Sequence, residues 1–144
     1  MHRFRFVILV GAVVGLASTG CTQIAAEAAP EPPAAVAEPI DGSELARIRL
    51  TEEAALRLAI ETAPVGMAGD ALTVPYGALL YDASGQSWVF TNPEPLVYVR
   101  EAIEVERIDA EVVTLASGPV AGTAVVTVGG AELYGVESGV GGGH

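Results

Sequence analysis

Turn-forming residues interrupt the second half of the chain at intervals of about ten residues. From Gly69 onward this spacing is typical of a protein built from short strands, because strands of about five residues joined by tight turns fill such intervals. The stretches between the turns are rich in valine and aromatic residues, which favour strands. Six strands are therefore predicted, over residues 78–81, 87–91, 96–100, 103–107, 112–115 and 124–128.

The segments between these strands have the composition of tight turns. Residues 82–85, 92–95 and 116–119 combine aspartate, asparagine, serine, glycine and proline. Short connections join antiparallel neighbours, so the sequence predicts a mainly β fold, a small antiparallel β-barrel or sandwich. Trp88 and Phe90 share one strand face, and Ile103 and Val105 alternate with Glu104 and Glu106. We therefore expect one side of the sheet to be dry and the other acidic.

One short amphipathic helix is predicted over residues 52–62. Glu53, Arg57 and Glu61 recur at every fourth position, which places them on one helical face. Thr51 precedes them and can cap the first turn. These charges are best explained as a solvated face rather than a site.

Pro75 interrupts an apolar stretch around Val74. Proline has no backbone N–H to donate to a strand ladder, so it is confined to sheet edges and strand ends. The sequence predicts an edge strand or a strand entrance here, and such an edge can accept a partner strand.

The amino terminus has the layout of a bacterial export signal. A short basic start precedes an uncharged run over residues 6–17, which falls short of the roughly 20 apolar residues needed to span a membrane. The small residues before Cys21 resemble the lipobox of bacterial lipoproteins, although Ser18 stands where that signal prefers leucine. The resemblance implies that residues 1–20 are a signal peptide and that Cys21 becomes lipidated.

The predicted domain organisation follows from this signal. Residues 21–44 contain four prolines, several acids and many alanines without an apolar period, which predicts a lipidated, disordered tether. Residues 45–137 form the β domain. Residues 138–144 are rich in glycine and are predicted to be a flexible tail.

The charge of the chain excludes one class of partner. Seven arginines and no lysine stand against eighteen acidic residues, which gives a formal net charge of -11. A strongly acidic protein repels phosphate backbones and anionic lipid surfaces. Nucleic acid is therefore not an expected partner.

The residues that usually carry catalysis are scarce. The chain has a single cysteine, and its two histidines, His2 and His144, lie at the ends. Neither an intrachain disulfide nor a cysteine-based zinc site can form. Ser84, Ser87 and Ser117 lie in turn-like stretches with no interior histidine or lysine to activate them. We predict no catalytic residue, no cofactor and no metal site.

Several strings in the β domain resemble the carboxy-terminal, membrane-proximal part of efflux periplasmic adaptors, also called membrane fusion proteins. Others resemble the start of the adaptors' barrel domain. The first set is Val74–Leu79, Ser87–Phe90 and Ser117-Gly118 with Gly122, Val125-Val126 and Gly129; the second is Ile48–Glu53 and Ile60–Val65. The resemblance implies a small β unit that lies against a membrane pump and acts through its surface.

This chain departs from a full adaptor in one respect. In the family, a lipoyl-like domain and a long helical hairpin separate the two sets of strings, whereas here only residues 66–71 lie between Val65 and Leu72. The parts that reach an outer-membrane channel are missing. The resemblance therefore implies docking to a transporter but not the bridging role.

The expected function is that of an exported, adaptor-like envelope protein. Lipid on Cys21 would anchor it to a bacterial membrane, on the periplasmic or outer-surface face, where it docks to an efflux-type transporter and supports its assembly or gating. The alternative is a free-standing envelope lipoprotein that captures a ligand or cation on its acidic sheet face. An envelope enzyme ranks third, because only the exported location suggests it.

Overall fold

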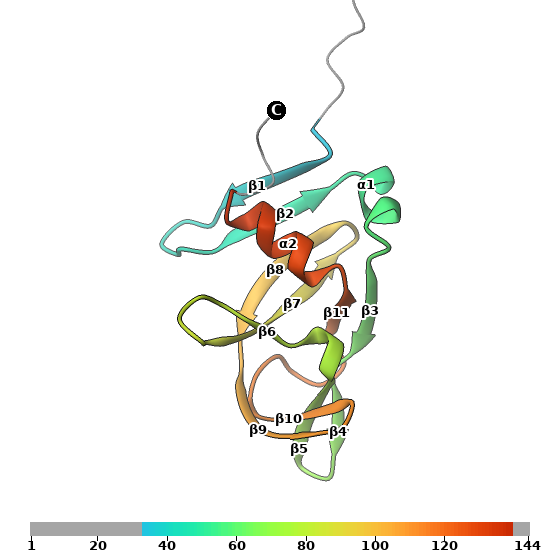
Figure 1. The fold of residues 1–144 in the computed structure, drawn as a ribbon, viewed down its shortest axis with the longest axis vertical. Helices are drawn as coiled ribbons and strands as arrows, with labels where there is room; N and C mark the ends of the chain where they lie inside the picture. The colour runs from blue at the N-terminus through green and yellow to red at the C-terminus, as the bar shows by residue number, and fades with distance from the viewer. Residues whose placement is uncertain (1–32, 140–144) are drawn as a thin grey trace, which may run out of the picture. The chain divides into compact units, whose positions relative to one another are not determined.

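Residues 33–139 are described by the computed structural model, and they form two antiparallel sheets with two α-helices (Figure 1). The predicted mainly β, antiparallel fold class is confirmed. The predicted signal peptide and Cys21 lie outside the described residues, as do residues 22–32 of the predicted tether and residues 140–144 of the predicted tail.

The larger sheet has the strand order β1-β2-β8-β7-β11-β3, and the short β6 pairs with β7. Every pairing in it is antiparallel. Its strands are β1 (Ala35–Pro39), β2 (Ala46–Leu50), β3 (Glu61–Pro64), β6 (Leu80–Tyr81), β7 (Ser87–Glu94), β8 (Val97–Ala102) and β11 (Ala124–Val128).

The smaller sheet has the order β4-β5-β10-β9. Its strands are β4 (Gly66–Ala68), β5 (Ala71–Pro75), β9 (Glu104–Asp109) and β10 (Val112–Ser117). The helices are α1 (Glu52–Arg57), the 3-10 turn η1 (Tyr76–Ala78) and α2 (Gly130–Glu137). In Figure 1, α2 lies across the larger sheet, and the smaller sheet lies at the opposite end of the described region.

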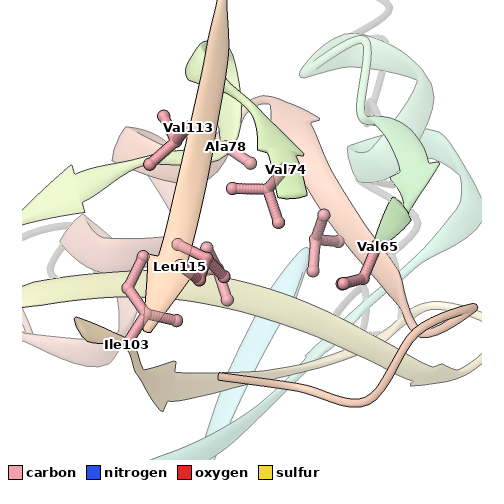
Figure 2. Close-up of a cluster of buried hydrophobic side chains, with 8 residues drawn as sticks. Val65, Val74, Ala78, Ile103, Val113 and Leu115 are labelled. Atoms are coloured by element: carbon pink, nitrogen blue, oxygen red, sulfur yellow. The ribbon is translucent and has the colours of Figure 1, made fainter. Parts of the chain in front are cut away.

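The central strands β7 and β11 of the larger sheet are buried on both faces. Successive residues of a strand point to opposite faces, and Val89 packs into a cluster shared with β5 and β10. Figure 2 labels Val74 of β5 and Val113 and Leu115 of β10 in this cluster. Its neighbour Phe90 packs into a second cluster with Leu133 of α2 and Ala54 of α1. In the larger sheet this arrangement corrects the prediction of one dry and one acidic face, because the helices cover its second face. In β9 of the smaller sheet Glu104 and Glu106 are exposed while Val105 packs on the core, as expected.

The helix α1 is shorter than predicted. Thr51 caps it as expected, because the Thr51 hydroxyl accepts a hydrogen bond of 3.1 Å from the Ala54 N–H. The helix ends at Arg57, and Ala59 has a φ of 49°, in the left-handed region that breaks a helix. The chain then enters β3, so residues 61 and 62 belong to a strand rather than to the predicted helix.

The predicted tether overlaps the fold. Residues 35–39 form the edge strand β1, which pairs with β2, and the Ile40 N–H donates to the Leu45 carbonyl across the hairpin. An edge strand needs few large apolar residues because only part of its surface is buried. Pro39 stands at the strand's end, where a missing N–H is tolerated. The folded region therefore begins before residue 45.

Two predictions about strand neighbours were wrong. The turn at residues 116–119 joins β10 of the smaller sheet to β11 of the larger one, so it does not link neighbouring strands. The strand β5 lies between β4 and β10 rather than at an edge. Pro75 is tolerated because it is the last residue of that strand.

The helix α2 was not predicted. It follows Gly129, whose φ of 89° lies in the left-handed region and where an added Cβ would displace the end of the Ile60 side chain. Leu133 of α2 is fully buried on the larger sheet. A helix of eight residues that contains two glycines has a low intrinsic helix propensity. Packing on the sheet therefore stabilises it.

Candidate functional site

A groove of about 550 Å³ lies on the smaller sheet, beside η1. Residues from β3, β4, β5, η1 and the turn into β10 line it. These residues are Pro64, Gly66, Thr73, Val74, Pro75, Tyr76, Gly77, Glu111 and Val112.

The strand register explains why these residues share a face. Val74 and Val113 are paired and point into the first core cluster. Their neighbours Pro75 and Val112 are also paired and therefore point the other way. Thr73 pairs with Gly66 on that same outer face. The groove thus lies on the face of the smaller sheet that is turned away from the core.

Tyr76 and Glu111 are fixed next to each other at the groove. The Tyr76 N–H donates a hydrogen bond of 2.8 Å to the Glu111 carbonyl. Tyr76 nevertheless keeps 51% of its surface exposed, and Val112 keeps 47%. A large aromatic side chain is therefore held on a rigid backbone while its ring stays accessible.

The local sequence accounts for this geometry. Pro75 has a φ of -61°, as its ring requires, and leads the chain from the strand into the 3-10 turn. Gly77 allows a close approach to β11, because a Cβ there would lie 2.9 Å from the Thr127 carbonyl oxygen. The string Val74–Leu79, one of those that suggested a resemblance to adaptors, thus includes the residues that project Tyr76 from the end of β5.

A second, smaller hollow of about 360 Å³ lies beside α1. Glu52, Ala55, Leu56, Ile60, Leu96 and Tyr98 line it, and Leu56 is 80% exposed. Burial raises the pKa of Tyr98. Burial also raises the pKa of Glu101, which lies outside both hollows. We take the larger groove as the candidate site because the resembling string forms its wall.

Arg100 forms a largely buried ion pair that sequence reasoning missed. Its Nε lies 2.8 Å from Glu137 Oε2, and the two side chains are 13% and 4% exposed. The guanidinium carbon lies 4.1 Å from the centre of the Trp88 ring and 5.1 Å from that of Tyr134. The other oxygen, Glu137 Oε1, accepts the Ala46 N–H at 3.2 Å. These contacts fasten α2 to the larger sheet, so the pair has a structural role.

The predicted hairpin turn at residues 82–85 is confirmed, and Asp82 organises it. The Asp82 carboxylate accepts hydrogen bonds from the hydroxyl and N–H of Ser84, the N–H of Gln86 and Nε1 of Trp88. These bonds stabilise the charged carboxylate and lower the pKa of Asp82 to about 2, and the bond from the Ser84 hydroxyl has the largest effect. Ser84 is thus held as part of a turn.

Replacing Asp82 with asparagine is expected to remove a pH-dependent part of the stability. The pKa of Asp82 is about 2 in the folded protein and about 3.9 in an unfolded chain. Its contribution is therefore fully present above about pH 4 and is lost as the pH falls through about 2. Urea denaturation of wild type and Asp82→Asn at several pH values should give a stability difference that shrinks between about pH 4 and pH 2. A difference independent of pH would contradict the role of the charge.

The structure brings together no catalytic constellation from the serines that the sequence singled out. Ser87 lies at the start of β7 and Ser117 at the end of β10, in different sheets. Within residues 33–139, no three histidine, cysteine, aspartate or glutamate side chains are grouped so that they could hold a metal ion. Over the same residues, no helix is long and apolar enough to cross a membrane. His2, Cys21 and His144 lie outside the described residues.

The sequence pointed to the groove only in part. It singled out residues 74–79 by their resemblance to adaptors, but Gly66 and Glu111 come from segments that gave no signal of their own.

Comparison of the chain with protein-family models, with curated proteins and with solved structures gives no significant match.

Proposed function

We propose that this protein is a lipid-anchored, adaptor-like envelope protein that docks to an efflux-type membrane transporter and supports its assembly or gating. The observation that carries the proposal is the groove on the smaller sheet. Its wall is the string Val74–Gly77, within the segment through which the chain resembles the membrane-proximal part of periplasmic adaptors. In this proposal the protein works by contact and carries out no reaction.

The properties of the groove suit a protein partner. Tyr76 of η1 and Val112 of β10 are half-exposed apolar side chains that line the same groove. Aromatic side chains often anchor protein interfaces, because they bury a large area with few rotatable bonds. A partner that covers the groove would remove both side chains from water, which is favourable.

The proposed anchor limits where such a partner can lie. Cys21 and Pro33 are twelve positions apart, and a fully extended chain of that length spans at most about 40 Å. Lipid on Cys21 would hold a protein at the membrane, and more stably with two or more acyl chains than with one. The groove would then meet proteins that protrude a short distance from the same membrane.

Site-specific photo-crosslinking in the native cell tests this function. A photoreactive amino acid replaces Tyr76 in one variant and Tyr81 in a matched control, because Tyr81 is 55% exposed and lies outside the groove. We expect the variant at position 76 to crosslink to an integral membrane component of a transporter, and the control to crosslink to it much less. Crosslinks to no transporter component, or equal crosslinking from both positions, would contradict the proposal.

A free-standing ligand-binding lipoprotein remains the second candidate. The volume of the groove, about 550 Å³, falls in the range of small-molecule sites. Calorimetric titration of the full-length protein with divalent metals and with small cationic solutes separates this candidate from the first. Saturable heat that is lost in Glu111→Gln would favour it.

A further inference from the structure

We propose that the groove binds an extended basic segment of another polypeptide, with an arginine or lysine placed between Tyr76 and Glu111 and an apolar side chain on Val112. This inference rests on the proposed docking function and names the chemistry of the partner. The argument starts from the charges that surround the groove.

The groove combines an exposed aromatic ring with a carboxylate. Tyr76 and Glu111 both line it, and a hydrogen bond from the Tyr76 N–H to the Glu111 carbonyl holds their backbones side by side. A cation over an aromatic ring is attracted by the negative face of the ring, and a nearby carboxylate adds a charge-assisted hydrogen bond. No arginine lines the groove, so within the described chain this combination lacks its cation.

The same combination already binds an arginine elsewhere in this chain. Arg100 lies 4.1 Å from the Trp88 ring centre and pairs with Glu137 at 2.8 Å. There the chain supplies ring, carboxylate and guanidinium together. At the groove the ring and the carboxylate are present, which leaves the guanidinium or ammonium to be supplied by a partner.

The charge around the groove favours a cationic partner over an acidic one. Residues 66–75 and 104–117, which make up the smaller sheet and its turns, contain five acidic residues and one arginine, Arg107. Asp109 pairs with Val112 and therefore points to the same face of the sheet. An acidic surface attracts basic segments and repels anionic lipid.

A second copy of this chain fits the groove less well. Residues 33–139 contain sixteen acidic residues and five arginines. Three of these arginines, Arg49, Arg57 and Arg100, already form ion pairs within the chain. Two such surfaces repel each other, so we infer a different, basic polypeptide.

Fluorescence anisotropy with a defined probe tests the inference. The probe is a short fluorescein-labelled peptide in which arginine alternates with leucine, titrated with the purified full-length protein in a neutral detergent. Its control is the same peptide with glutamate in place of arginine. We expect saturable binding of the basic peptide, weakened by added salt, and no binding of the acidic one.

Matched variants assign the binding to the groove. Glu111→Gln and Tyr76→Ala should each weaken binding of the basic peptide roughly five- to tenfold. Glu132→Gln and Tyr81→Ala change exposed residues outside the groove and should leave it within about twofold of wild type. Circular dichroism checks that every variant keeps its strand content. Equal affinity in all four variants would overturn the inference, because it would show non-specific attraction to an acidic surface.

Two further results distinguish this inference from the proposed function. Peptide binding that depends on Glu111 and Tyr76, without crosslinking of a transporter from position 76, supports the basic partner and contradicts the transporter role. Transporter crosslinking without peptide binding does the reverse. Concentration-dependent dimerisation that Tyr76→Ala abolishes, measured by analytical ultracentrifugation, would also overturn the inference in favour of a second copy.

Discussion

Replacing Glu137 with alanine is expected to destabilise the fold by about 3–5 kcal/mol, because it leaves the charge of Arg100 buried without its partner. The Arg100 side chain is 13% exposed and the Glu137 side chain 4%. The substitution also removes the acceptor for the Ala46 N–H. Since small domains are stable by only about 5–15 kcal/mol, the variant should lose much of its stability.

Urea denaturation followed by tryptophan fluorescence measures this effect, because Trp88 lies against the Arg100 guanidinium. The exposed pair of Arg57 and Glu53, with a distance of 2.7 Å, is the matched control. Glu53→Ala should cost no more than about 1 kcal/mol, since solvent screens that pair.

A double variant separates the charge from the packing. Arg100→Met with Glu137→Leu removes both charges and keeps apolar volume, so it should be markedly more stable than Glu137→Ala alone. If Glu137→Ala costs no more than Glu53→Ala, the pair does not fasten α2 to the sheet.

The strands β7 to β11 could be predicted because their signals are local. The valine-rich runs and the turn around Asp82 and Gly85 lie within a few residues of each other, and both are found in the structure. Pairing across the sheets is not local. The connection at residues 116–119 looks like a hairpin turn in the sequence, yet β10 and β11 belong to different sheets. The composition of a turn cannot distinguish a connection between neighbouring strands of one sheet from a connection between two sheets.

The missed elements depend on contacts between distant residues. The strand β1 is held by pairing with β2, and Glu137 of α2 is 37 positions from Arg100. Neither segment has a strong pattern of its own, so the segment of β1 was predicted to be part of the tether and α2 was not predicted as a helix. The groove is similar. Its wall at Val74–Gly77 was singled out, but only the register with β10 brings Val112 to the same face.

Substituting either of two adjacent core residues of β7, Val89 or Phe90, is also expected to destabilise the fold strongly. The reason is that the two side chains belong to separate clusters on opposite faces of the larger sheet. Phe90→Ala is expected to cost about 3–5 kcal/mol and Val89→Ala about 2 kcal/mol or more. Both side chains have no exposed surface. A strand with one solvated face would instead tolerate one of the two changes.

The two losses should also be nearly additive, since Val89 packs towards the smaller sheet and Phe90 towards the helices. Chemical denaturation of both single variants and the double variant tests this, and a destabilised double variant is measured with a stabilising osmolyte present in all samples. Val120→Ala and Tyr81→Ala are the matched controls, because these side chains are 75% and 55% exposed and should change stability by no more than about 0.5 kcal/mol. If Val89→Ala leaves the free energy of unfolding unchanged, or if the two losses are far from additive, the larger sheet does not separate two independent cores.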